Sequence, residues 1–309
     1  MIRIGSIGDT IYRVILLAAA SSILILVAAI VFMMVQSSMP SITRFGLGFL
    51  TGAEWAPAQE TFGALPFIWG TLVSSIIAII LAVPVSLGIA VFLVEQAPRS
   101  VARPIAFMVE LLAAIPSVVY GLWGIFVLAP FIRSYLGPLL QNNLGWIPLF
   151  QGRLTGIGML TGGIILAIMI TPIVTAVVRD ILEAVPTAQR EAALALGATK
   201  WETTVIVLGN AASGIAGAVV LGLGRALGET MAITMVIGNS PQITTSLFEP
   251  AYTIASVLAA NFADATNEMY LSALVEMGLI LFLLTLVVNA LAKLLIMSVA
   301  RRSNVGGHV

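Results

Sequence analysis

An arginine and a glutamate stand four residues apart in an otherwise apolar stretch, which reads G-L-G-R-A-L-G-E-T at 222–230. In a helix, residues i and i+4 lie on one face, one turn apart, so Arg225 and Glu229 can pair. A guanidinium keeps its charge in apolar surroundings and presents a planar fork of donors that matches an oxyanion. The pair and the neighbouring hydroxyl of Thr230 therefore predict a site that binds an oxyanion.

Glu229 would let such a site distinguish one oxyanion from another. Near pH 7 phosphate still carries a proton that a carboxylate can accept, whereas sulfate carries none and would be repelled. The alternative is that the two charges only neutralise each other inside a helix bundle. Apolar side chains could replace a purely structural ion pair at little loss of stability, so we favour a functional role.

The composition of the whole chain is that of a membrane protein. Of its 309 residues, 60% are hydrophobic and only 9% are charged, and the mean hydropathy is +1.09. Soluble domains carry roughly 45–50% apolar and about 25% charged residues. A net charge of +0 without any basic tract argues against a nucleic-acid partner, and the lack of cysteine excludes disulfides and thiolate metal sites.

Six apolar runs are long enough to cross the roughly 30 Å hydrocarbon core of a bilayer, which takes about 20 helical residues. We predict an all-α membrane protein with a single domain over 1–309, because an open strand edge in lipid would leave backbone groups without partners. The predicted spans are 14–35, 68–93, 105–131, 154–178, 213–237 and 271–298. Arg225 is then expected near the middle of the fifth span.

The basic residues predict how these spans are oriented. Ten Lys and Arg residues fall in the termini and connections of one side, and three fall on the other side: Arg44, Arg133 and Arg153. Because the basic side is normally cytoplasmic, both termini are predicted to be cytoplasmic. The apolar stretch 251–262 is too short to span and suggests a re-entrant or interfacial helix, and 137–153 is similarly ambiguous.

The longest cytoplasmic connection, 179–210, predicts a docking element. Pro186 interrupts one helix, the alanine-rich residues after it favour a second short helix, and Gly197 is the type of residue that ends one. A short helix at the cytoplasmic face suits docking into a groove of another protein, although it could also lie idle in the interface. The only lysines, Lys200 and Lys293, follow no phosphate-binding glycine loop, so we expect no nucleotide or other cofactor and no enzyme activity.

Part of this connection resembles a known docking loop. Glu191, Ala192 and Ala193, with Gly197 four residues on, are similar to the EAA loop through which permeases of ATP-binding-cassette (ABC) importers contact their ATPase subunits. The resemblance implies that the segment couples this chain to ATP hydrolysis on a partner. The proline that usually closes the family's pattern is absent, since 206–209 read I-V-L-G.

Three further segments carry a closer resemblance. They are G-L-G-R-A-L-G-E-T-M-A at 222–232 with V-I-G-N at 236–239, G-A-E-W at 52–55, and F-G-A-L-P-F-I-W-G at 62–70. They resemble phosphate permeases of ABC importers, of the PstC type. This implies a MetI-like permease fold of the type I importers, placed in the inner (plasma) membrane of a prokaryote and importing inorganic phosphate.

The same resemblance implies a set of partners. They are a second, homologous permease subunit in a heterodimer, ABC ATPase subunits, an extracytoplasmic phosphate-binding protein and membrane lipid. Three other functions fit parts of the sequence: a permease for another oxyanion such as sulfate or molybdate, a phosphate-sensing membrane scaffold that does not transport, and a carrier driven by a proton or sodium gradient. The docking loop would have no evident task in the last of these.

Overall fold

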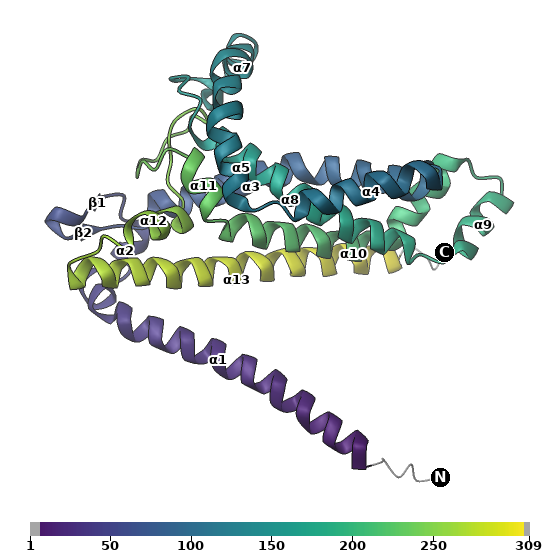
Figure 1. Cartoon of the computed structure of the whole chain (residues 1–309), viewed down its shortest axis with the longest axis horizontal. Helices are drawn as coiled ribbons and strands as arrows, with labels where there is room; N and C mark the ends of the chain where they lie inside the picture. The colour runs from purple at the N-terminus through teal and green to yellow at the C-terminus, as the bar shows by residue number, and fades with distance from the viewer. Residues whose placement is uncertain (1–6, 306–309) are drawn as a thin grey trace.

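The computed structural model describes residues 7–305, with the side chains of 8–294, as a bundle of long apolar helices (Figure 1). Within this part, six helical segments are long and apolar enough to cross a membrane, which confirms the predicted all-α fold with six spans. They are α1 (Ile7–Phe45), α3 (Leu65–Val91) with its π-helical extension η2 (Phe92–Gln96), a composite segment from Ser117 to Leu144, α8 (Met159–Glu183), α10 (Lys200–Gly228) and α13 (Glu268–Val305).

Helix α8 is the centre of the bundle, where it packs against α3, α10 and a shorter helix, α4 (Arg99–Ala113). It is the most buried of the six segments. Two adjacent glycines let its neighbours approach closely: a Cβ built on Gly163 would lie 2.5 Å from Cγ2 of Ile77, and one on Gly162 would lie 2.7 Å from Cδ1 of Ile233. Small residues are the usual means by which membrane helices pack this tightly.

The predicted third span, 105–131, is wrong, because it covers two separate helices that are divided at Pro116. Helix α4 ends before this proline, which has no N–H to donate and disfavours helical backbone at the residue before it. The membrane-length segment begins beyond it and consists of α5 (Ser117–Trp123), η3 (Gly124–Leu128), α6 (Ala129–Phe131), η4 (Ile132–Leu136) and α7 (Gly137–Leu144). In Figure 1, α4 runs alongside α8, whereas α5 to α7 turn away from it.

A small hairpin region closes the end of the bundle where α1 meets α3. It contains α2 (Gly48–Thr51), η1 (Pro57–Gln59) and two antiparallel strands, β1 (Trp55–Ala56) and β2 (Thr61–Phe62). The rings of Trp55 and Phe67 lie 4.8 Å apart and tie the hairpin to α3. Hydrogen bonds from Arg44 (2.7 Å) and Asn267 (2.6 Å) hold the pKa of the Glu60 carboxyl below its ordinary value.

The two ambiguous stretches, 137–153 and 251–262, contain short helices. Helix α7 completes the composite third segment and is followed by η5 (Pro148–Phe150). Helix α12 (Ile254–Asn261) has eight residues and begins with a capping box in which Thr253 and Ser256 exchange hydrogen bonds. It packs against α3, α13 and the short α11 (Met231–Val236), so it is a buried element beside the start of α13 and not a seventh span of the described chain.

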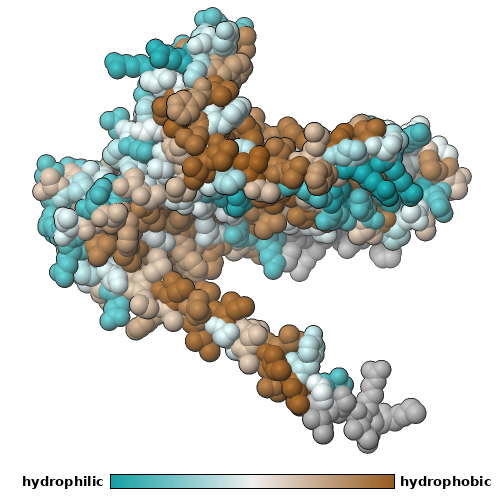
Figure 2. Space-filling view, in the orientation of Figure 1, coloured by the Kyte–Doolittle hydropathy of each residue, from teal (hydrophilic) through white to brown (hydrophobic). Residues whose placement is uncertain are grey.

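Helix α1 leaves the bundle over most of its length (Figure 1). Its last part packs on α13, where the Ser41 N–H donates to Ser272 Oγ at 3.1 Å. Every residue from 8 to 30 is exposed, and Figure 2 shows that much of this uncovered surface is apolar. In a membrane such a surface contacts lipid or another membrane helix.

Candidate functional site

The predicted fifth span, 213–237, is not one continuous helix. Helix α10 ends at Gly228, and α11 begins three residues later. Between them Glu229 has an extended backbone with φ −68° and ψ 127°, and its carboxylate accepts a hydrogen bond from the Ala232 N–H at 3.3 Å. Arg225 therefore lies in the last turn of α10, where its positive charge also offsets the negative end of the helix dipole.

This break lies deep along the bundle. Gly224 of α10 faces the carboxamide of Asn289 in α13, because a Cβ built on Gly224 would lie 3.8 Å from Asn289 Nδ2. At 1.5 Å per residue, Asn289 is roughly 30 Å along α13 from Glu268. Unwound backbone between membrane helices is normally covered by protein or lines a polar cavity.

The three predicted site residues meet at this break but are placed differently. Arg225 Nη2 and Glu229 Oε2 are 4.0 Å apart, and their side chains are 44% and 8% exposed, respectively. Thr230 uses its hydroxyl to donate to the Gly228 carbonyl at 3.2 Å. Because the backbone becomes extended after Gly228, Glu229 is buried in the protein while the Arg225 guanidinium stays on the helix surface.

Arg225 lines a groove of about 610 Å³ between α8, α10 and α13. It is the one charged residue among those that line the groove, and Gly217 and Gly224 open the groove by lacking side chains. The remaining lining residues are Ile173, Val220, Leu221 and Asn289. An exposed guanidinium in a groove whose other described lining residues are uncharged can hold an oxyanion by charge-assisted hydrogen bonds.

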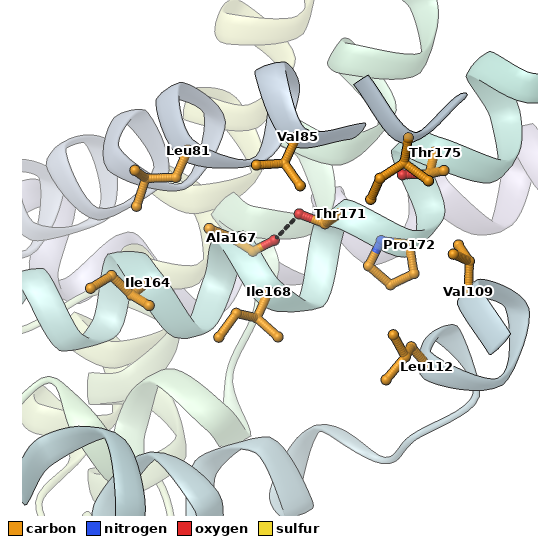
Figure 3. Close-up of a pocket in the computed structure, with 11 residues that line it drawn as sticks. Leu81, Val85, Val109, Leu112, Ile164, Ala167, Ile168, Thr171, Pro172 and Thr175 are labelled. Carbon is orange, nitrogen blue, oxygen red and sulfur yellow. Dashed lines mark hydrogen bonds between the residues drawn. The ribbon is translucent and has the colours of Figure 1, made fainter. Parts of the chain in front are cut away.

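A second cavity, of about 310 Å³, lies between α3, α4 and α8 and is unsuited to an anion (Figure 3). Its lining is mostly aliphatic, with Leu81, Val85 and Ile168 among the side chains that face it, and its polar side chains are Thr171 and Thr175. The Thr171 hydroxyl is not available to a ligand as a donor, because it donates to the Ala167 carbonyl at 2.7 Å. With no charged side chain in this lining, the groove at Arg225 remains the candidate oxyanion site.

The predicted docking loop has the predicted helix–turn form. Helix α9 (Thr187–Ala195) follows Pro186, and Gly197 beyond it has φ +86°, a left-handed conformation that favours glycine. Glu191 and Ala192 are exposed, whereas Ala193 is buried against the bundle. The sequence analysis missed the capping box that begins α10, although its signal, Thr199 followed three residues later by Glu202, is present.

Arg190 fastens α9 to the membrane helices. Its Nη2 donates to Glu95 Oε1 at 2.8 Å and its Nε to the same atom at 3.1 Å, which binds the loop to η2 at the end of α3. The guanidinium also donates to the carbonyls of Leu182 and Val185 at the end of α8. Nothing in the local sequence signals this contact, because its two partners are far apart in the chain.

Comparisons with known proteins agree with this geometry. A family model described as "Binding-protein-dependent transport system inner membrane component" matches residues 83–301. Over 271 residues the chain is 48% identical to the phosphate transport system permease protein PstC of Mesorhizobium japonicum, covering 86% of this chain and 83% of that protein. The chain belongs to this family of inner-membrane transport components.

Other relatives match the permease over a similar share of the chain. It is 46% identical to PstC of Pasteurella multocida, over 87% of this chain and 85% of the relative. It is 37% identical to the probable phosphate transport system permease protein PstC of Methanocaldococcus jannaschii, over 82% of each chain. Membership of the family makes the chain a transport subunit and not an enzyme, and implies ATPase and substrate-binding partners.

The permease also shares its fold with a solved transporter. An inward-facing structure of the MetNI methionine ABC transporter matches with a TM-score of 0.56 and 17% sequence identity, over 75% of this chain and 94% of that chain. At this identity the likeness shows the fold alone, and it confirms the predicted MetI-like arrangement. Among the described residues, no group of three or more His, Cys, Asp or Glu is placed to hold a metal ion.

Proposed function

We propose that the permease is a membrane subunit of an ABC importer that moves inorganic phosphate into the cytoplasm. The main support for the site is Arg225, an exposed guanidinium and the one charged group among the described residues that line the groove. The choice of phosphate is supported by the relatives, whose names give phosphate transport. Arg225 would bind the oxyanion during its passage and release it when the groove changes shape.

Glu229 and Thr230 have supporting roles in this proposal. The Glu229 carboxylate accepts the Ala232 N–H and lies next to Arg225, so it positions the guanidinium and the start of α11. Thr230 holds the unwound turn by its hydrogen bond to Gly228. Glu229 does not line the groove, so it acts on the anion through Arg225. We therefore assign it no direct hydrogen bond with the proton of phosphate.

The coupling role belongs to α9 and the turn after it. Glu191, Ala192, Ala193 and Gly197 form the segment that we propose docks on an ATPase subunit. Leu196 and Trp201 beside it are 90% and 66% exposed, which provides apolar surface for such a contact. The Arg190–Glu95 hydrogen bonds would carry movement of the docked helix to α3.

We expect the permease to work in a heterodimer with a second, homologous permease, together with ATPase subunits and an extracytoplasmic phosphate-binding protein. The groove at Arg225 is open on one side, and the exposed α1 leaves apolar surface for another membrane helix. Half of the translocation path would then be supplied by each permease.

The test is uptake by the complete transporter reconstituted in proteoliposomes. Arg225→Ala should lower ATP-dependent phosphate uptake roughly 100-fold or more, because a bidentate charged contact is lost, while the complex still assembles. Arg225→Lys keeps the positive charge but lacks the planar fork of donors. Its phosphate uptake should therefore lie between that of the wild type and that of Arg225→Ala. The matched control is Arg133→Ala, an exposed arginine outside the groove, which should transport normally.

Normal uptake by Arg225→Ala would reject this groove as the path. Competition assays identify the substrate: arsenate should inhibit uptake as a phosphate analogue. Inhibition by sulfate or molybdate in place of arsenate would assign the permease to another oxyanion, and phosphate binding without uptake would make the complex a sensor.

A further inference from the structure

Asn289 is a carboxamide without a partner inside an apolar helix. It lies on α13 in the run L-V-V-N-A-L at 286–291, where its Oδ1 is buried and has no hydrogen-bond partner. Its Nδ2 also donates to no described residue. Unpaired polar groups are unfavourable in a membrane protein, so an amide kept in this position needs a ligand or a partner.

The position of Asn289 indicates which ligand it would bind. The amide faces Gly224, the residue before Arg225, and an added Cβ there would lie 3.8 Å from Nδ2. Asn289 and Arg225 also line the same groove, from opposite helices. Nδ2 has no hydrogen-bond partner among the described residues and is not fully buried, so this donor is accessible to a ligand in the groove that Asn289 lines.

We propose that Asn289 contacts the transported oxyanion directly, with Nδ2 donating a hydrogen bond to the anion that Arg225 binds. This inference rests on the function proposed above. The guanidinium supplies the charge, and the amide supplies a second donor from another helix without a second positive charge. An anion held by both groups bridges α10 and α13 and is released when these helices move apart.

The experiment uses the complete transporter in proteoliposomes, with inorganic phosphate supplied by its binding protein. Asn289→Ala should lower uptake per ATP hydrolysed about tenfold or more, because one hydrogen bond to a charged ligand is lost. Thr285→Val is the matched control, since it removes a hydroxyl one turn earlier on α13 that only bonds the Phe282 carbonyl of its own helix. Its uptake should be unchanged.

A second variant gives a signature that a purely structural role would not. Asn289→Asp replaces the amide donor with a carboxylate of nearly the same size, which would pair with Arg225 and repel the anion, so uptake should be lost while the complex still assembles. Wild type and Thr285→Val should transport normally. Normal uptake by Asn289→Asp would overturn the inference, as would normal uptake by Asn289→Ala.

Assembly separates this proposal from its main rival, an amide that bonds the second permease. If Asn289→Ala reduces the amount of assembled complex at equal expression, the amide serves the interface and the inference fails. The Arg225 variant keeps the two proposals distinct. Normal uptake by both Arg225→Ala and Asn289→Ala rejects the groove as the path, whereas a defect in Arg225→Ala alone rejects only the role of Asn289.

Discussion

At the scale of single residues, Gly70 shows how closely the short helices pack on the long ones. It lies in α3, where a Cβ would overlap the backbone carbonyl of Tyr252 just before α12. The next residue, Thr71, accepts the Ile254 N–H on its hydroxyl at 2.9 Å, so the start of α12 rests on this turn of α3. Neither group can move without breaking the contact between the two helices.

We predict that Gly70→Ala destabilises the folded permease by about 3 kcal/mol or more, because the backbone must shift to admit the methyl group. The control is Gly88→Ala in the same helix, where nothing lies within 4 Å of the added Cβ. That variant should be neutral or stabilising by up to about 1 kcal/mol, because alanine favours helix. Thermal unfolding of the two purified variants measures the difference, and equal midpoints would contradict the packing described here.

At the scale of elements, the connection between α9 and the membrane helices is made mainly by polar contacts. The Arg190 guanidinium bonds η2 through Glu95 and the end of α8 through two carbonyls. Asn210 of α10 adds a hydrogen bond to Gln189 at 2.8 Å. Helix α9 is therefore hydrogen-bonded to three membrane segments: η2 at the end of α3, the end of α8, and α10.

Arg190→Lys should uncouple transport from ATP hydrolysis. A lysine keeps the charge but cannot donate to Glu95 and the two carbonyls together, so we expect uptake per ATP to fall roughly tenfold. Glu183→Gln, which removes a carboxylate that is exposed and 4.0 Å from Arg179, is the control. Phosphate uptake and ATP hydrolysis measured on the same proteoliposomes give the ratio. An unchanged ratio in Arg190→Lys would show that coupling takes another route.

At the scale of the whole molecule, the polar surface gathers at the two ends of the bundle. The end of α3, helix α4, the end of α8 and all of α9 lie together, joined by the ion pairs Arg190–Glu95 (2.8 Å) and Arg179–Glu110 (2.9 Å). The hairpin and α12 lie at the opposite end (Figure 1). The positive-inside rule predicts that the first of these ends is cytoplasmic.

The chain contains no cysteine, so single-cysteine variants can test this orientation without background. Ala58→Cys and Asn142→Cys place exposed thiols in the predicted outer connections, and Ser100→Cys places one at the start of α4. A membrane-impermeant maleimide should label the first two in right-side-out vesicles and the third in inside-out vesicles. The reverse pattern would invert the topology. The termini themselves lie partly outside the described residues.

Much of this fold could be predicted because its signals are local. A run of about 20 apolar residues is sufficient to define a membrane helix, since its own backbone hydrogen bonds are complete within it. Pro186 and Gly197 likewise act on their immediate neighbours, so α9 could be predicted from its own residues. The predicted bounds of the third span were wrong because apolar residues continue across Ala113–Pro116. This apolar run hid the break between α4 and α5 that Pro116 causes.

By itself, then, the sequence determined the membrane class, the number of spans and the short helix after Pro186, and it predicted Arg225 as a site residue. Only the tertiary structure decided that α10 stops at Gly228, that Glu229 is buried while Arg225 faces a groove, and that Asn289 lies opposite. Arg225 and Asn289 are brought together by the packing of α10 on α13, and Arg190 and Glu95 by the contact of α9 with η2. Apolar length is a property of one segment, whereas a polar site in a bundle depends on which faces of distant helices meet.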